Sequence, residues 1–137
     1  MKKIFFPLMM LAAATTLPVH AEKDTPLGKE MEAMNDAFKG FRKETDPAKG
    51  AATAREAEDH CLKAMAFVPA KLEKETDAAA KAKGLVEYKI QMSKLYATLC
   101  EIEGAFLAKD LTKVADLSET MKGEKKEGHG KFIDKDE

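Results

Sequence analysis

An unbroken alternation of three- and four-residue spacings between apolar side chains, from Leu85 to Phe106, is the strongest constraint on the fold. The apolar positions are Leu85, Tyr88, Met92, Leu95, Leu99, Ile102 and Phe106. This spacing places all of them along one face of an α-helix, whereas a half-buried strand would need alternation at every second residue. A helix with one apolar seam has to bury that seam against other helices. The pattern therefore predicts a helical bundle.

Two further helices are expected before this seam. The first covers about residues 26–43, with Thr25 as its N-cap and Pro26 in its first turn. Its apolar stripe consists of Met31, Met34, Phe38 and Phe41. The second follows Asp46-Pro47 and stops at Pro69, and its inward residues are Ala54, Ala57, Cys61, Ala64, Met65 and Val68. Residues 69–83 are polar and are expected to form a long connection that includes the beginning of the seam helix.

A last helix is expected after Asp110, which is a suitable N-cap. Its buried side is expected at Leu111, Val114, Leu117, Met121 and Phe132. Gly123, Gly128 and Gly130 each weaken this helix by about 1 kcal/mol relative to Ala. Short links before the second and the last helix favour antiparallel neighbours, so the predicted fold is all-α, an up-down-up-down antiparallel four-helix bundle. A three-helix bundle with a frayed tail is the alternative.

The N-terminal residues have the three parts of a secretory signal peptide. Met1-Lys2-Lys3 is basic, residues 4–14 are apolar, and Val19-His20-Ala21 has small residues at the positions that signal peptidase reads. The apolar run is too short to span a bilayer. We therefore predict a secretory signal peptide over residues 1–21 and a single bundle domain over residues 22–137. A retained anchor is the alternative.

The exported part of the chain argues against several classes of function. It has 21 basic and 24 acidic residues, a net charge of −3, and no basic face, so nucleic acid is not an expected partner. No segment after the signal peptide is apolar enough to cross a membrane. The sequence has no Ser-His-acid arrangement, no His-Glu-x-x-His motif and no phosphate-binding glycine loop. We therefore predict that the protein is not an enzyme.

Cys61 and Cys100 are not expected to form a disulfide. Cys61 lies about eight residues before the end of its helix and Cys100 about fifteen after the start of the next, so at about 1.5 Å per residue their heights differ by roughly 10 Å. The Cα atoms of a disulfide lie within about 7 Å of each other. We therefore predict a core position for Cys61 and a half-buried one for Cys100. His60 points about 100° away from Cys61 and makes a poor joint metal site with it.

Methionines and His129 gather at one end of the predicted bundle. Met31 and Met34 lie near the start of the first helix and His129 near the end of the last, so the topology places them at similar depth. Met65 and Met92 fall at the same end, and His129 is expected within the apolar stripe, toward one edge. Such a cluster is often only flexible core packing. A thioether facing an imidazole is also the ligand set of a low-spin haem that carries electrons.

Two other functions remain open on these residues. Thioethers favour Cu(I), and Met31, Met34, Met92 and His129 could bind copper without haem. Alternatively, the bundle holds no cofactor and binds a protein partner, with the methionines as plain core.

Four short segments carry a resemblance to a known family. These segments are Met31-Glu32-Ala33-Met34-Asn35-Asp36, Pro69-Ala70-Lys71-Leu72, Glu87-Tyr88 with Met92, and Gly128-His129-Gly130-Lys131-Phe132. Their order and spacing resemble those of the cytochrome b562 family, periplasmic four-helix haem proteins, over the whole exported chain. The family has Pro-Pro-Lys-Leu after its second helix and closes with Tyr-His-x-Lys-Tyr.

The resemblance implies a small periplasmic electron carrier, monomeric, that meets redox partner proteins transiently. It implies one non-covalent haem b per chain, because the cysteine positions of a covalent attachment motif are Lys125 and Gly128 here. Met31 would be the sixth iron ligand and His129 the fifth. The expected haem-contacting residues are Met34, Phe38, Tyr88 and Met92, with Met65 at the same end of the bundle and Lys125 near the haem carboxylates.

The chain departs from the family pattern at several of these positions. Tyr88 and Met92 stand where the family has phenylalanines, and Gly128 stands where it has a tyrosine. Lysines, of which Lys125 is the expected contact, replace arginines near the haem carboxylates. Lysine neutralises a carboxylate but lacks the bidentate fork of arginine, so these substitutions are expected to affect how tightly haem is held.

Overall fold

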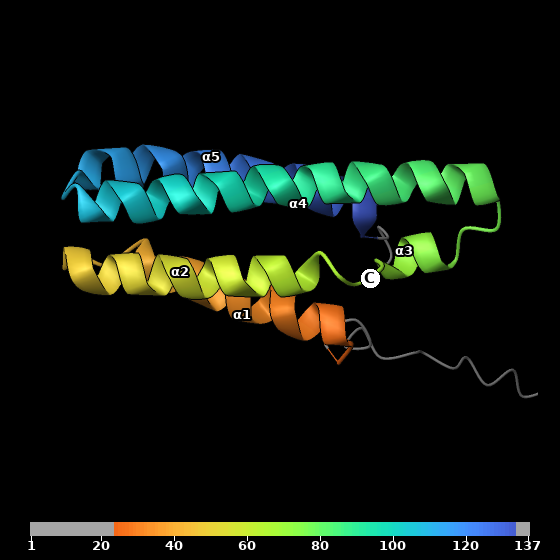
Figure 1. The fold of residues 1–137 in the computed structure, drawn as a ribbon, viewed down its shortest axis with the longest axis horizontal. Helices are drawn as coiled ribbons and strands as arrows, with labels where there is room; N and C mark the ends of the chain where they lie inside the picture. Colours follow the sequence, from red (N-terminus) through yellow and green to blue (C-terminus); the bar gives the residue numbers. More distant parts are fainter. Residues whose placement is uncertain (1–23, 134–137) are drawn as a thin grey trace, which may run out of the picture.

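The computed structural model describes residues 24–133, and this part of the chain consists of helices joined by turns and loops, with no strand. The helices are α1 (Pro26–Phe41), α2 (Pro47–Ala64), α3 (Ala70–Glu73), α4 (Ala78–Leu107) and α5 (Leu111–Phe132). Figure 1 shows the four long helices lying alongside one another, with α1 and α2 in one layer and α4 and α5 in the other. The all-α prediction is confirmed. The predicted signal peptide lies outside the described residues.

The long helices begin at side chains that cap free backbone N–H groups. The Thr25 hydroxyl accepts a hydrogen bond from the Gly28 amide at 2.9 Å, and Asp46 accepts from the Ala48 amide at 2.9 Å. Asp110 accepts from the Lys113 amide at 2.9 Å. Each cap satisfies a donor that has no partner inside its helix. All three N-caps were predicted from the sequence.

The start of α4 lies within the segment that was expected to include it. Asp77 accepts a hydrogen bond from the Ala80 amide at 2.7 Å, and α4 begins at Ala78, in the second half of the connection predicted over residues 69–83. Residues 78–83 have no apolar stripe, but alanine and lysine are strong helix formers. A cap and high helix propensity therefore extend the helix beyond its buried seam.

Two helix ends and several burial states differ from the predictions. α1 ends at Phe41 rather than near residue 43, and α2 ends at Ala64, with Met65 as its C-cap, rather than at Pro69. Pro69 has no N–H to donate to the carbonyl of Met65, four residues earlier, and its ring clashes with that carbonyl, so the helix cannot continue through Pro69. Leu111 is exposed because it is the first residue of α5, at the end of the molecule. The residues found half-buried rather than buried are Met65, Val68, Leu85 and Leu117.

One end of the molecule, which we call the closed end, is packed around Phe41 and Phe106, both fully buried. Their ring centroids lie 6.4 Å apart in an edge-to-face arrangement, a favourable geometry for aromatic pairs. Gly50 of α2 lies directly against Phe106, since a Cβ on Gly50 would fall 2.2 Å from the ring atom Cε1. Ala51 and Ala54 continue this close approach between helices.

The helices do not pack equally on all sides. Within the described residues, α1 packs on α2, α2 on α4 and α4 on α5, but no Cα atom of α1 comes within 8 Å of a Cα atom of α5. The side between α1 and α5 is therefore the open side of the molecule, where only long side chains bridge the gap. No helix among residues 24–133 is both long and apolar enough to span a bilayer.

Candidate functional site

A cavity of about 330 Å³ lies between α1, α4 and α5, on the open side of the molecule. Its lining residues are Leu27, Gly28, Met31, Glu32, Met34, Asn35, Phe38, Lys39, Pro69, Tyr88, Gln91, Met92, Leu95, Met121, Glu124, Lys125, Gly128, His129, Phe132 and Ile133. The lining set contains no residue of α2. Pockets for small molecules and cofactors begin at about 300 Å³ and are mostly apolar with a few polar groups, as this one is.

The walls of the cavity are built from sulfur-containing and aromatic side chains. Met34, Met92 and Met121 are buried, and Met31 is half-buried. The rings of Tyr88 and Phe132 meet edge to face with centroids 5.3 Å apart. The Tyr88 hydroxyl donates a hydrogen bond to the Ala64 carbonyl at 2.9 Å, and burial raises the pKa of Tyr88 above its usual value. Tyr88 is therefore a neutral, fixed part of the wall.

His129 lies in the last turn of α5 and lines the cavity from the side opposite α1. Partial desolvation of the ring at the cavity wall, together with the nearby charge of Lys125, lowers the pKa of His129 below its usual value. The imidazole is therefore neutral at neutral pH, the form that binds metals. No hydrogen bond from residues 24–133 holds the ring.

The side chain of His129 is more exposed than predicted. We expected it within the buried stripe of its helix, but it is solvent-exposed at the mouth of the cavity. The residues on either side, Gly128 and Gly130, have no side chains that could cover it. A Cβ on Gly128 would make an ordinary contact, 3.5 Å from Gln91 Cγ, so an alanine would fit next to His129.

Lys125 spans the gap between α5 and α1. Its Nζ donates a hydrogen bond to Asn35 Oδ1 at 2.6 Å, joining two helices whose backbones stay apart. Of the lysines in this part of α5, only Lys125 lines the cavity. Lys131 instead pairs with Glu127 on its own helix at 2.6 Å. Lys125 thus places one positive charge at the cavity.

A polar group on the cavity wall was missed by the sequence analysis. Thr98 of α4 donates a hydrogen bond to Glu124 Oε1 at 3.0 Å, and Gln91 Nε2 donates to the Glu124 carbonyl at 3.0 Å. Burial raises the pKa of Glu124 above its usual value. A signal was present in the sequence, since Gln91 and Thr98 directly precede the seam residues Met92 and Leu99, and Glu124 follows Met121 by one helical turn.

The cavity brings together seven of the eight side chains that the sequence analysis assigned to a cofactor site. These are Met31, Met34, Phe38, Tyr88, Met92, Lys125 and His129. Met65 is not among the lining residues, because it caps α2, the long helix that contributes nothing to the cavity wall. The roles assigned to these residues, ligands included, stay predictions.

The two cysteines and His60 lie apart from this cavity. Both cysteines are free, Cys61 buried and Cys100 half-buried, as predicted. Cys61 Sγ donates to the Met92 carbonyl at 3.5 Å, while His60 Nδ1 lies 2.6 Å from Glu30 of α1. Within residues 24–133 no group of three or more His, Cys, Asp or Glu side chains could hold a metal ion.

The model of the cytochrome b562 family matches residues 26–132, from the first residue of α1 to the last of α5. The chain belongs to the cytochrome b562 family. Members of that family are haem-binding electron carriers and are generally not enzymes. No curated protein matches the sequence.

The residues of the cavity fit the haem that the cytochrome b562 family implies. An iron–porphyrin needs apolar walls and only two protein ligands, so the absence of a carboxylate or cysteine cluster is no obstacle. Thioethers on α1 and a neutral imidazole on α5 belong to the same cavity. Lys125 supplies a cation for an acidic group.

Proposed function

We propose that the cavity binds one haem b non-covalently and that the protein is a small electron carrier. The observation that carries this proposal is the pairing of thioethers on α1 with the imidazole of His129 on α5 around one apolar cavity. Membership of the cytochrome b562 family supports it. When bound, haem would supply an iron that gains and loses a single electron.

Met31 and His129 are the proposed axial ligands. Met31 is half-buried, and the lowered pKa of His129 leaves its imidazole unprotonated and able to bind metal. Two protein ligands leave the iron no open position, so electron transfer rather than oxygen chemistry is expected. Thioether ligation favours the reduced state and raises the potential.

The other lining residues would hold and shield the group. Met34, Phe38, Tyr88 and Met92 present apolar surface to it, and Lys125 would neutralise a carboxylate after releasing Asn35. Gly128 contributes no side chain to the wall. Lysine gives a single charged contact where the bidentate arginine fork is absent, so we expect weaker binding than a bulky and arginine-bearing wall would give.

We also propose an up-down-up-down antiparallel bundle of the four long helices, with α3 in the connection. The order of packing along the chain supports this topology, and in Figure 1 α1 and α4 run in one direction and α2 and α5 in the other. The signal-like residues 1–21 support export to the periplasm. There a monomeric carrier would meet its redox partners over a small, transient interface.

A spectrum of the exported protein tests the haem proposal. The chain is produced in cells supplied with haem and iron, purified and reduced, and sharp α and β bands of a six-coordinate haem are expected. Met31→Ala removes a proposed ligand and should convert the haem from low to high spin. Met34→Ala is the matched control, because it removes a thioether of the same cavity. A spin change in Met34→Ala alone would move the ligand assignment to Met34.

Copper binding is a second candidate, favoured by the number of thioethers at one place. Met31, Met34, Met92 and Met121 all line the cavity with His129, and Cu(I) prefers such soft donors. A colourless protein that takes up one Cu(I) per chain, and loses it in Met92→Leu, would support copper over haem.

A further inference from the structure

Glu124 places a carboxyl group on the wall of the cavity. We propose, given that haem occupies this cavity as proposed above, that Glu124 is a proton-exchanging residue that sets the potential of the haem: it releases its proton when the haem is oxidised and recovers it on reduction. The residue is not one of the proposed ligands and is five positions from His129.

Residues of α4 hold Glu124 in place, but only one of its two carboxyl oxygens has a hydrogen-bond partner among residues 24–133. Thr98 donates to Oε1 at 3.0 Å, and the Gln91 amide anchors the backbone carbonyl of the same residue at 3.0 Å. The second oxygen, Oε2, is shielded from solvent and has no hydrogen-bond partner among residues 24–133. A shielded carboxylate oxygen without a donor is unfavourable, and protonation of the carboxyl removes the cost of burying the charge.

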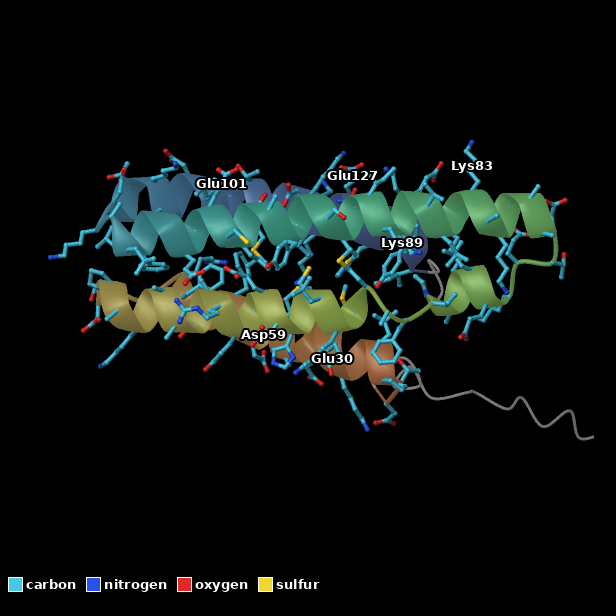
Figure 2. All side chains as sticks on the ribbon, in the orientation of Figure 1. Glu30, Asp59, Lys83, Lys89, Glu101 and Glu127 are labelled. Carbon is cyan, nitrogen blue, oxygen red and sulfur yellow. The ribbon has the colours of Figure 1, made fainter. Side chains whose placement is uncertain are left out.

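Burial has a larger effect on the pKa of Glu124 than the charged groups around it. Burial raises its pKa, the Thr98 hydrogen bond and the charge of Lys94 lower it, and Glu127 and Glu101 raise it again. Figure 2 shows Glu101 and Glu127 on the outer side of the α4–α5 layer, and neither of them lines the cavity. The other charged lining residues are Glu32 and Lys39 of α1 and Lys125 of α5, with His129 neutral. α3 contributes no lining residue.

The proposed coupling is an exchange of charge across the cavity. Loss of one electron by the haem, to a one-electron acceptor such as a redox partner protein, adds one positive charge beside Glu124. That charge favours the carboxylate, so one proton leaves Glu124 for solvent as one electron leaves the haem. Reduction reverses both steps. Because the coupling is reciprocal, ionisation of Glu124 must in turn favour the oxidised state and lower the potential.

Equilibrium redox titrations of the haem-loaded protein between about pH 4 and pH 8 test the coupling. The midpoint potential should fall as pH rises through the pKa values of Glu124, with a slope approaching about 59 mV per pH unit for one proton per electron. Glu124→Gln cannot ionise and should remove this slope, while Glu124→Asp should restore it. Glu119→Gln, an exposed substitution on the same helix, is the matched control and should behave as wild type.

Thr98→Val provides a second test, because it removes the hydrogen bond to Glu124 and leaves the carboxyl group itself unchanged. The Thr98 hydrogen bond lowers the pKa of Glu124, so its loss should move the pH-dependent window of the potential to higher pH. A purely structural role for Glu124 would not produce this displacement. A wild-type potential independent of pH, or a Glu124→Gln variant that keeps the wild-type slope, would overturn the proposal.

Unfolding of the haem-free protein gives a readout independent of the cofactor. A carboxyl whose pKa is raised on folding binds its proton more tightly in the folded state, so the free energy of unfolding should decrease as pH rises through that pKa. In Glu124→Gln the free energy of unfolding should depend less on pH. Absence of a haem spectrum would overturn the proposed function and the coupling together, whereas a haem spectrum with a pH-independent potential would overturn the coupling alone.

Discussion

The closed end and the cavity end are built from the same helices but packed in opposite ways. At the closed end, Phe41 and Phe106 are fully buried, and Gly50 lets α2 lie directly against an aromatic ring. At the cavity end, a space of 330 Å³ remains between α1, α4 and α5. A bundle can therefore combine a tightly packed half, which supplies stability, with an open half that can take up a ligand.

The residue types at each end explain the difference. Small residues in α2, Gly50, Ala51 and Ala54, allow a close approach between helices and leave no space around the aromatic rings. The cavity end is lined by methionines, which adapt to irregular gaps, and the cavity stretch of α5 includes Gly128, which adds no side chain to the wall. We expect perturbations to affect stability more strongly at the closed end, and the following predictions test that contrast.

The largest difference in stability is expected between two variants, each of which lacks one aromatic ring, at the closed end or at the cavity end. Phe106→Ala should lower the free energy of unfolding of the haem-free protein by about 3–5 kcal/mol, because it leaves a void that dense packing cannot fill. Phe132→Ala should cost at least roughly 1 kcal/mol less, because it enlarges a space that already exists. Urea denaturation of both variants measures the difference, and equal losses would contradict the contrast.

A smaller effect is expected from adding a methyl group at Gly50. Gly50→Ala places a Cβ 2.2 Å from the buried Phe106 ring, and overpacking of this kind costs about 1–3 kcal/mol. This cost exceeds the gain of about 1 kcal/mol from better helix propensity. The melting temperature of the haem-free protein should therefore fall.

Gly123→Ala is the matched control for this prediction. Nothing lies within 4 Å of a Cβ at Gly123, so only the helix-propensity gain applies, and α5 should be stabilised by about 1 kcal/mol. A stabilising Gly50→Ala would show that the closed end has more room than its packing indicates.

The smallest effect concerns Glu58 of α2, a buried carboxyl outside the cavity. Burial first, and then the charge of Glu103, raises the pKa of Glu58. The folded state therefore binds this proton more tightly than the unfolded state, and stability should decrease as pH rises through the raised pKa. In Glu58→Gln, urea unfolding between about pH 4 and pH 8 should show a flatter pH profile. Glu56→Gln, at an exposed position of α2, should keep the wild-type profile.

The seam residues show how much of the fold could be predicted. From Tyr88 to Phe106 every apolar position of the predicted seam is buried, because the 3.6-residue period alone decides which side chains share a helix face. The caps Thr25, Asp46 and Asp110 followed from local hydrogen-bond chemistry. The start of α4 was expected only somewhere within residues 69–83, because residues 78–83 form a helix through propensity and a cap rather than through an apolar stripe.

The site could be predicted only in part. Met31 and His129 line one cavity, as depth along two helices indicated, but Met65 at the same depth does not, because depth gives no information about which side of the bundle a helix occupies. The carboxyl of Glu124 was missed because its burial depends on Thr98 and Gln91 of another helix. A charged residue on a helix is ordinarily solvated, so the spacing of Glu124 from Met121 is not enough by itself to place its carboxyl in a cavity.

By itself the sequence determined the four long helices, three of their four N-caps, the buried face of the seam helix and the family, because each depends on interactions within about one helical turn or on residue order. The tertiary structure alone decided that α1 and α5 stand apart, that the cavity lies between them, that His129 reaches its mouth and that Glu124 lines its wall. Those features depend on the distance between the axes of neighbouring helices, which is set by the size of the side chains that meet between them. No local pattern in the chain encodes that distance.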